Sequence, residues 1–181
     1  MNKRHISEMK EWIPECKAGD SLLLSGVVYA ARDAIHKKWM ASILRGETFP
    51  LSFERAGIYY VGPTPAMPGH VIGSCGPTTS ARMDMYYPTL ADLGLRLTIG
   101  KGNRSEEVRQ KIVQTGGIYL CAIGGAGAFY ANCVKSMEIV AFEELGCESL
   151  KKLELMDMPV YVGIDCYGNQ IFSAGNGGEL T

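Results

Sequence analysis

The spacing of apolar positions along the chain predicts an alternation of strands and helices. Short, continuous apolar runs rich in β-branched residues are typical of buried strands. Such runs predict strands at 21–31, 57–63, 95–100, 118–123, 137–142 and 158–165. Helical spacing follows the first run, because Ile35, Trp39 and Ile43 stand four residues apart within 32–45 and would share one face of a helix.

Two further helices are expected, at about 81–93 and at 105–117. The second of them has end signals as well as length. Ser105 can cap the first turn and Gly116 can close the last, since a serine hydroxyl accepts a free backbone N–H and glycine tolerates the left-handed conformation. A glycine-rich turn at 124–128 is expected to lead into another helix.

The order of these elements predicts a layered α/β fold. Strands alternate with helices in the second half of the chain, which favours helices packed on a sheet. The first half contains more strand and loop, including the proline- and glycine-rich segment 64–79, whose composition predicts a loop. We expect one domain over residues 1–181, with a frayed tail at 173–181.

The composition limits the kinds of molecule that the chain is expected to bind. The chain has 181 residues, of which 46% are hydrophobic and 20% charged, as in ordinary globular proteins. A net charge of −1 argues against a nucleic-acid surface, which usually carries a basic excess. Residues 1–12 are polar and no run approaches the roughly 18 apolar residues of a membrane span. We therefore expect a cytoplasmic protein without a secretion signal or membrane segment.

The spacing of the cysteines favours neither a zinc ribbon nor a disulfide framework. None of the six forms a CxxC pair, and they stand far apart at Cys16, Cys75, Cys121, Cys133, Cys147 and Cys166. The simplest interpretation is that they are buried or idle thiols, so no metal site is expected in this chain. Cys75 differs only in its place, directly before the sequence GPTT.

Three cations stand where a predicted strand gives way to the next element. Arg32 follows the first strand, Lys101 follows the strand at 95–100, and Arg82 follows the GPTT turn. Ligand sites of α/β proteins lie at such junctions, and arginine can grip a carboxylate with two hydrogen bonds. Taken singly, each could be an ordinary surface cation. Together they suit a small anion with two charges.

Two glycine-rich stretches resemble nucleotide loops without matching them. In IGKGNRS, five residues separate Gly94 from Gly100, and Gly102 stands where a phosphate loop needs serine or threonine. In GGAGA at 124–128 the glycines lack the spacing of a dinucleotide fingerprint. Close packing of a helix on a strand explains these glycines equally well, so nucleotide binding is the weaker alternative.

Two side chains have groups suited to proton transfer. Thr78 opens the pair that follows Gly76 and Pro77, and such a threonine can either cap a turn or act as a base if a neighbour activates it. His36 stands four residues after Arg32, on the same helical face. An imidazole there could do acid–base work or simply donate to a backbone carbonyl.

Several stretches occur together in the order seen in one family. They are SGVVYAARDAIHKK, YYVGPTPAMPGHVIGSCGPTTSARMDMY, IGKGNRSEEVRQ, YLCAIGGAGAFYANCV and FEELGCESLKKLELMDMPVYVGIDCYGN. The chain resembles the β subunit of two-subunit class I fumarases and L(+)-tartrate dehydratases, which corresponds to the C-terminal domain of single-chain class I fumarases. The resemblance covers about residues 15 to 172.

The resemblance implies a swivelling β/β/α domain and a hydro-lyase reaction, the reversible addition of water to a four-carbon dicarboxylate. It implies a [4Fe-4S] cluster as Lewis acid, bound by an α subunit and not by this chain. By motif, Thr78 matches the catalytic base, and Arg32, Arg82 and Lys101 match cations that bind substrate carboxylates. His36 matches a histidine counted among the active-site residues of the tartrate branch.

The resemblance favours fumarate and (S)-malate as substrates, with L(+)-tartrate and its product oxaloacetate as the alternative. It also implies a hetero-oligomer in which this chain is inactive without its α partner. Because the residues supply no complete catalytic set, a second hypothesis remains. The chain could be a binding or assembly module, with all catalysis on the partner.

Overall fold

A computed structural model describes residues 1–47 and 51–172, so the tail expected to fray at 173–181 lies outside the described residues. The fold is a mixed α/β arrangement around one seven-stranded sheet. The strands are β1 Asn2–His5, β2 Ser21–Ala30, β3 Gly57–Tyr59, β4 Leu97–Gly100, β5 Ile118–Cys121, β6 Val134–Ala141 and β7 Leu150–Ile164. The α-helices are α1 Met9–Trp12, α2 Asp33–Leu44, α3 Tyr87–Asp92, α4 Glu106–Thr115 and α5 Gly127–Asn132. The 3-10 turns are η1 Ile6–Glu8, η2 Ile13–Glu15, η3 Ser80–Met83 and η4 Glu143–Glu148.

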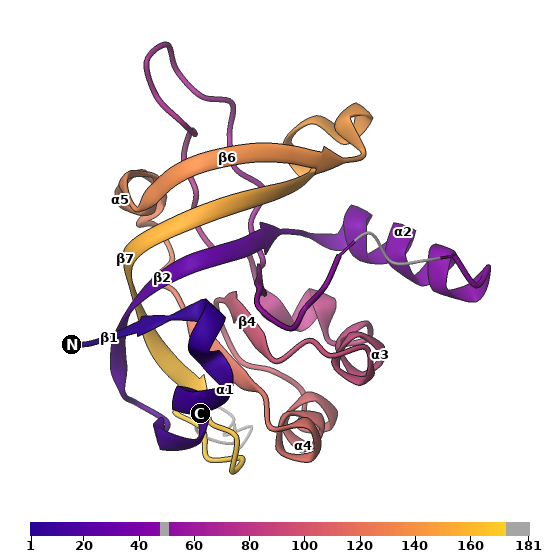
Figure 1. Cartoon of the computed structure of the whole chain (residues 1–181), viewed down its shortest axis with the longest axis vertical. Helices are drawn as coiled ribbons and strands as arrows, with labels where there is room; N and C mark the ends of the chain where they lie inside the picture. The colour runs from indigo at the N-terminus through magenta and orange to yellow at the C-terminus, as the bar shows by residue number, and fades with distance from the viewer. Residues whose placement is uncertain (48–50, 173–181) are drawn as a thin grey trace, which may run out of the picture.

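Strand pairing closes part of the sheet on itself. Strands β1 to β5 pair in parallel in sequence order, and β7 runs antiparallel to β5, β2 and β6. Because β7 pairs with both β2 and β5, the strands β2, β3, β4, β5 and β7 form a closed ring, with β1 and β6 as extensions. Figure 1 shows β6 alongside the first part of β7, on the side opposite β2.

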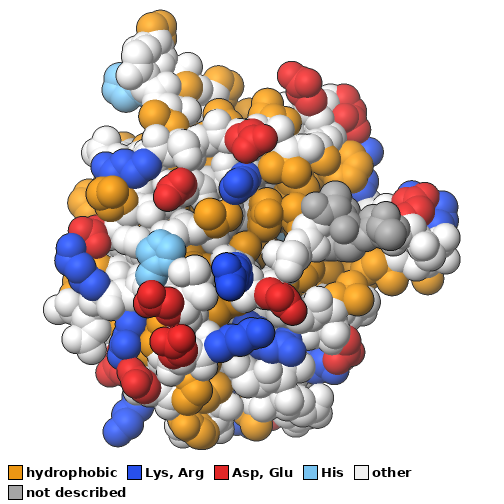
Figure 2. All heavy atoms as spheres, in the orientation of Figure 1, with side chains coloured by type: hydrophobic (Ala, Val, Ile, Leu, Met, Phe, Trp, Pro, Cys, Tyr) orange, Lys and Arg blue, Asp and Glu red, His pale blue; other side chains and the backbone are white. Residues whose placement is uncertain are grey.

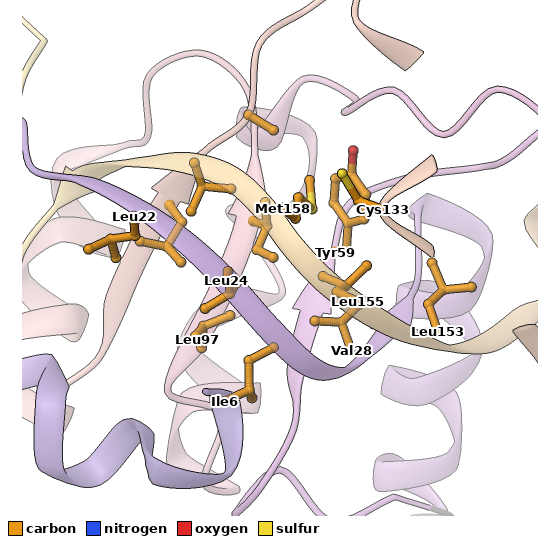
Figure 3. Packing of buried hydrophobic residues seen from close by; sticks show 14 of the residues in the cluster. Ile6, Leu22, Leu24, Val28, Tyr59, Leu97, Cys133, Leu153, Leu155 and Met158 are labelled. Atoms are coloured by element: carbon orange, nitrogen blue, oxygen red, sulfur yellow. The ribbon is translucent and has the colours of Figure 1, made fainter. Parts of the chain in front are cut away.

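The core has two parts, one on each side of this sheet. Inside the ring, apolar side chains of β2, β4 and β7 meet, among them Leu24, Leu97 and Met158 (Figure 3). Outside it, α2, α3 and α4 cover the sheet (Figure 1). Trp39 and Leu90 are buried there. The burial of such side chains contributes the largest favourable term to folding.

The strongest sequence signals are confirmed. The expected strand at 21–31 is β2, and the helix expected at 32–45 is α2. The helix expected at 105–117 is α4, in which the Ser105 side chain accepts from the Val108 N–H and Gly116 adopts the left-handed conformation at φ 65°. The glycine-rich turn leads into α5 as expected.

Two expectations about element extent are wrong. The expected helix at 81–93 is interrupted, with η3 followed by the short α3, which begins at Tyr87 and has Pro88 in its first turn; proline favours the first turn of a helix and disfavours its interior. The expected strand at 158–165 is only the second half of β7, which begins at Leu150. The first half of β7 was not predicted because Lys151, a charged residue, is buried within it. Its ammonium donates to the carbonyl oxygens of Gly146 and Cys147, at 2.9 and 3.1 Å.

The sequence pattern also missed the N-terminal elements. Strand β1 consists of the polar residues Asn2 to His5 and is an edge strand beside β2. An edge strand can be polar because one of its sides faces water. The short helical turns that follow bury Ile6, Met9 and Trp12 against β2 and the ring interior. Their length, near one turn each, gave no periodicity to detect.

Candidate functional site

The site is built at the carboxyl ends of three neighbouring parallel strands, β2, β3 and β4. Arg32 follows the end of β2 and Lys101 follows the end of β4, with Gly62 just beyond β3 between them. Parallel strands present their carboxyl ends at one edge of a sheet, which is where α/β proteins place ligands. The chain therefore brings Arg32 and Lys101 to a common edge.

The GPTT segment is held against this edge by backbone hydrogen bonds. The Thr78 N–H donates to the Tyr60 carbonyl oxygen at 2.7 Å. The Lys101 N–H donates to the Thr78 carbonyl oxygen at 3.2 Å, and the Ser80 N–H donates to the Lys101 carbonyl oxygen at 2.9 Å. Thr78 and Lys101 are thus fixed relative to each other by main-chain contacts. Thr78 itself is half-buried.

Lys101 lies against the glycine-rich turn before α5. A Cβ atom at Gly124 would stand 3.5 Å from Lys101 Cδ and 3.7 Å from its Nζ. The glycine there leaves open space beside the ammonium. Gly124, in the stretch that resembles a nucleotide loop, therefore packs against the Lys101 side chain.

Arg32 occupies the start of α2 and covers Gly62. A Cβ atom at Gly62 would stand 2.8 Å from Arg32 Cδ, so a larger residue there would displace the guanidinium. Arg32 Nε lies 3.5 Å from a carboxylate oxygen of Glu148, and the side chain is 26% exposed. The Arg32 side chain is therefore partly accessible to solvent.

Arg82 is paired with an acidic side chain of this chain. Its Nε and Nη2 donate to the two carboxylate oxygens of Asp33, at 3.1 and 2.7 Å. Asp33 directly follows Arg32, so the pair ties η3 to the start of α2. The Arg82 side chain is half exposed. A substrate carboxylate would have to share this guanidinium with Asp33 or displace it, and the geometry is the two-bond one that arginine offers to carboxylates.

His36 lies beneath the strand ends, with no part exposed. Its Nδ1 donates to the Arg32 carbonyl oxygen at 2.8 Å, and its Nε2 is buried with no hydrogen-bond partner within residues 1–47 and 51–172. The rings of Trp39, Tyr60 and Tyr86 surround it at 5.2, 5.6 and 5.4 Å between centroids. Burial lowers the pKa of His36 to about 4. The structure places His36 below the other four residues and in contact with Arg32.

This burial predicts a stability loss in mild acid. The pKa of His36 is about 4 in the fold and near 6.5 in an unfolded chain, so the unfolded state binds the extra proton first. The free energy of unfolding should fall as the pH drops from about 6.5 to 4, by roughly 3 kcal/mol from this group. Urea unfolding across this range measures it.

The control for His36→Phe is the same substitution at His70. His36→Phe should flatten this part of the pH profile, because phenylalanine can pack among the same rings and cannot titrate. His70 is exposed on the 62–74 loop, and His70→Phe should leave the slope as it is. Equal slopes in the His36→Phe variant and the unmodified chain would contradict the assignment.

Cys75 is part of the core and has no feature of a metal ligand. It is fully buried, and burial raises the pKa of its thiol to about 12. Its N–H donates to the Gly127 carbonyl oxygen at 2.9 Å, and its carbonyl oxygen accepts from the Tyr59 hydroxyl at 2.6 Å. Cys75 therefore anchors the GPTT segment to α5 and β3.

The described ranges, 1–47 and 51–172, contain no group of three or more His, Cys, Asp or Glu side chains arranged to hold a metal ion. Within the same residues, no helix is both long and apolar enough to cross a membrane.

On the face shown in Figure 2, basic and acidic side chains are intermixed. This face therefore carries no broad basic patch among the described residues.

Sequence reasoning missed the acidic and buried partners of the predicted cations. Asp33 and Glu148 pair with Arg82 and Arg32. Asp84 and Arg104 form a pair beneath the site, with Arg104 Nε 2.5 Å from the Asp84 carboxylate. A partial signal was present, since Asp33 adjoins Arg32 and Asp84 stands two residues after Arg82. The pairings themselves join distant segments and need the fold to be seen.

A mixed α/β domain with cations and a threonine near the ends of neighbouring strands has an arrangement suited to a small anion. Comparison with known protein families is more specific. The family model described as fumarase C-terminus matches residues 1–175. The chain belongs to this family.

The similar proteins are either about three times as long as the matched region or close to it in length. The chain is 36% identical over 173 residues to fumarate hydratase 2 of Leishmania major, covering 94% of this chain and 30% of that protein. It is 36% identical over 171 residues to the aerobic class I fumarate hydratase of Escherichia coli K12, covering 93% and 31%. A Methanocaldococcus jannaschii protein, provisionally named L(+)-tartrate dehydratase subunit beta, is 34% identical over 173 residues, with 92% and 89% covered. The chain thus spans under a third of the length of the fumarate hydratases it matches.

Proposed function

We propose that this chain is the β subunit of a hydro-lyase that reversibly adds water to a four-carbon dicarboxylate, with fumarate and (S)-malate as the favoured pair. The observation that carries the proposal is the fixed pairing of Thr78 with Lys101, flanked by Arg32 and Arg82 at one sheet edge. The family match over residues 1–175 supports it. In fold terms, we infer the swivelling β/β/α domain of this family.

The cations have a defined task in this reaction. Removal of a proton from the carbon beside a carboxylate builds negative charge on that carboxylate. Lys101 and Arg32 would hold it through ammonium and guanidinium groups already placed at the strand ends. Arg82 would hold the other carboxylate, in exchange for Asp33. Cations that are in position before the reaction stabilise this charge without first having to reorganise.

Thr78 would act as the proton acceptor in the direction of water loss and as the donor in hydration. A threonine hydroxyl is a weak base, so it needs an activating group. The half-buried position of Thr78 leaves room for that group to come from a partner chain. In this account His36 supports the Arg32 carbonyl oxygen from below, because its imidazole is buried and neutral at physiological pH.

The partner is inferred from the similar proteins and from the cysteines. The fumarate hydratases similar to this chain are more than three times as long as the matched region, and a protein of similar size carries the name of a β subunit. The iron–sulfur cluster expected for this family does not fit the residues of this chain, because Cys75 is a buried thiol and the described cysteines form no ligand set. We assign the cluster to an α subunit that completes a hetero-oligomer.

The test is anaerobic co-expression of this chain with its α partner, followed by a fumarate hydration assay. The complex should hydrate fumarate to (S)-malate, and neither chain alone should do so. A tartrate arm in the same assay decides the substrate branch, since a complex that dehydrates L(+)-tartrate and ignores fumarate would replace the favoured pair. Unchanged affinity and turnover after Arg32→Ala, Arg82→Ala and Lys101→Ala would favour the assembly-module alternative.

A further inference from the structure

The two segments that carry the proposed catalytic groups meet over a buried ion pair. Arg104 and Asp84 come from different segments, the loop after β4 and the end of η3. The Arg104 side chain is completely buried, and its Nε lies 2.5 Å from Asp84 Oδ1. The second carboxylate oxygen of Asp84 accepts from the Ser105 N–H at 2.6 Å. Both oxygens of Asp84 therefore bind the loop that begins at Lys101.

Three tyrosines enclose the guanidinium. Its central carbon lies 5.4, 5.1 and 5.0 Å from the ring centroids of Tyr60, Tyr87 and Tyr119. Aromatic faces favour a cation at this range. A buried charge is costly unless it is paired and surrounded by such groups. This arrangement fixes the position of Arg104 instead of leaving it as a surface cation.

Tyr119 forms a second bridge between the same two segments. Its hydroxyl lies 2.9 Å from Ser80 Oγ and donates to the Gly102 carbonyl oxygen at 2.8 Å. Ser80 also packs so tightly against Gly100 that a Cβ atom there would clash with its hydroxyl. The segments 78–84 and 100–105 are therefore joined by these side chains and by the two backbone hydrogen bonds that Lys101 forms with Thr78 and Ser80.

We propose that the Arg104–Asp84 pair, together with the Tyr119 hydroxyl bridge, is a positioning element that holds Thr78, Arg82 and Lys101 in one reactive geometry. The proposal rests on the function proposed above for these three residues. Arg104 itself is buried and touches no substrate. It acts through Asp84, which stands two residues after Arg82 and six after Thr78, and through its own loop, which begins at Lys101.

Hydrogen exchange tests this without any need for catalysis. In Asp84→Asn, the amides of Thr78, Ser80 and Lys101 should exchange at least roughly tenfold faster, because the two segments then open locally. None of these amides donates a hydrogen bond to Asp84. Faster exchange would therefore show that the two segments have opened, not that a hydrogen bond to Asp84 has been lost. Amides of the β2–β7 ladder should keep their rates. Asp92→Asn is the matched control, since it breaks the Lys111–Asp92 pair on the neighbouring α3 and α4 and should leave all of these rates unchanged.

Tyr119→Phe provides a second, uncharged variant in case Asp84→Asn does not fold. It removes the hydroxyl bridge and keeps the ring over Arg104, and the same three amides should exchange faster. In the assembled enzyme, both variants should lower kcat by at least about tenfold with the subunits still associated, since misplaced groups lose much of their catalytic effect.

Two results would overturn the proposal: unchanged exchange at the three amides in the folded variants, or equal acceleration in the β2–β7 ladder. The second result would make the pair a support for the whole fold. If the unmodified complex lacked hydratase activity, the proposed function would fail while the exchange result still decided whether the two segments are held together by this pair.

Discussion

Replacing Thr78 by alanine is expected to lower the turnover of the assembled enzyme by roughly 10²–10⁴-fold, the range that a positioned acid or base contributes. The substitution removes the hydroxyl and the neighbouring γ-methyl group and leaves the backbone unchanged. The backbone contacts of Thr78 to Tyr60 and Lys101 are formed by main-chain atoms and should persist. Steady-state fumarate hydration by the anaerobic complex measures the loss, and size-exclusion chromatography shows whether the subunits remain together.

Neighbouring substitutions make this result specific. Thr78→Ser keeps a hydroxyl and should retain a large part of the activity. Thr79→Ala removes the adjacent threonine, which is exposed, and should remain close to the unmodified enzyme. Turnover in Thr78→Ala within a few-fold of normal would remove Thr78 from the role of base and would favour a chain that only binds and assembles.

Lys101→Gln is expected to lower kcat/KM by roughly 10²–10³-fold, the effect of removing one group that stabilises developing negative charge. Glutamine is similar in length and polar, so the packing against Gly124 should change little. The loss should appear in kcat as well as in KM, because the carboxylate gains charge in the transition state. Initial rates over a range of fumarate concentrations separate the two parameters.

Two further lysine substitutions serve as controls for Lys101→Gln. Lys101→Arg keeps the charge but brings a wider head group to the space beside Gly124, so we expect intermediate activity. Lys152→Gln removes an exposed lysine on β7 and should have little effect. If Lys101→Gln raised only KM, the lysine would contribute to substrate binding alone, and its proposed role in the transition state would be wrong.

The sequence predicted those elements whose local signals were strong. Helix α4 has a cap at each end, and β2 is rich in apolar and β-branched residues, so both appear as expected. The first half of β7 was missed because Lys151 is buried there among carbonyl oxygens. A polar residue facing inward breaks the pattern on which strand prediction depends. The ring formed by β7 with β2 and β5 depends on long-range pairing, which apolar spacing does not encode.

The candidate site, like the fold, was predicted only in part. The positions of Arg32 and Lys101 at strand ends followed from the order of elements, because parallel strands place their carboxyl ends together. The engagement of Arg82 by Asp33 and the pairing of Arg104 with Asp84 did not follow. Both join residues on separate segments. The resemblance to a family supplied residue roles, and the structure supplied the contacts that hold those residues.

The most direct test of the account is proton exchange at C3 of (S)-malate in ²H₂O, followed by NMR with the anaerobic complex. Exchange at this carbon reports the proton transfer that we assign to Thr78 in this chain. The account predicts deuterium at C3 with the unmodified complex and with Thr79→Ala, and almost none with Thr78→Ala in an intact complex. Exchange at the normal rate in Thr78→Ala would contradict it, because the base would then lie on the partner chain.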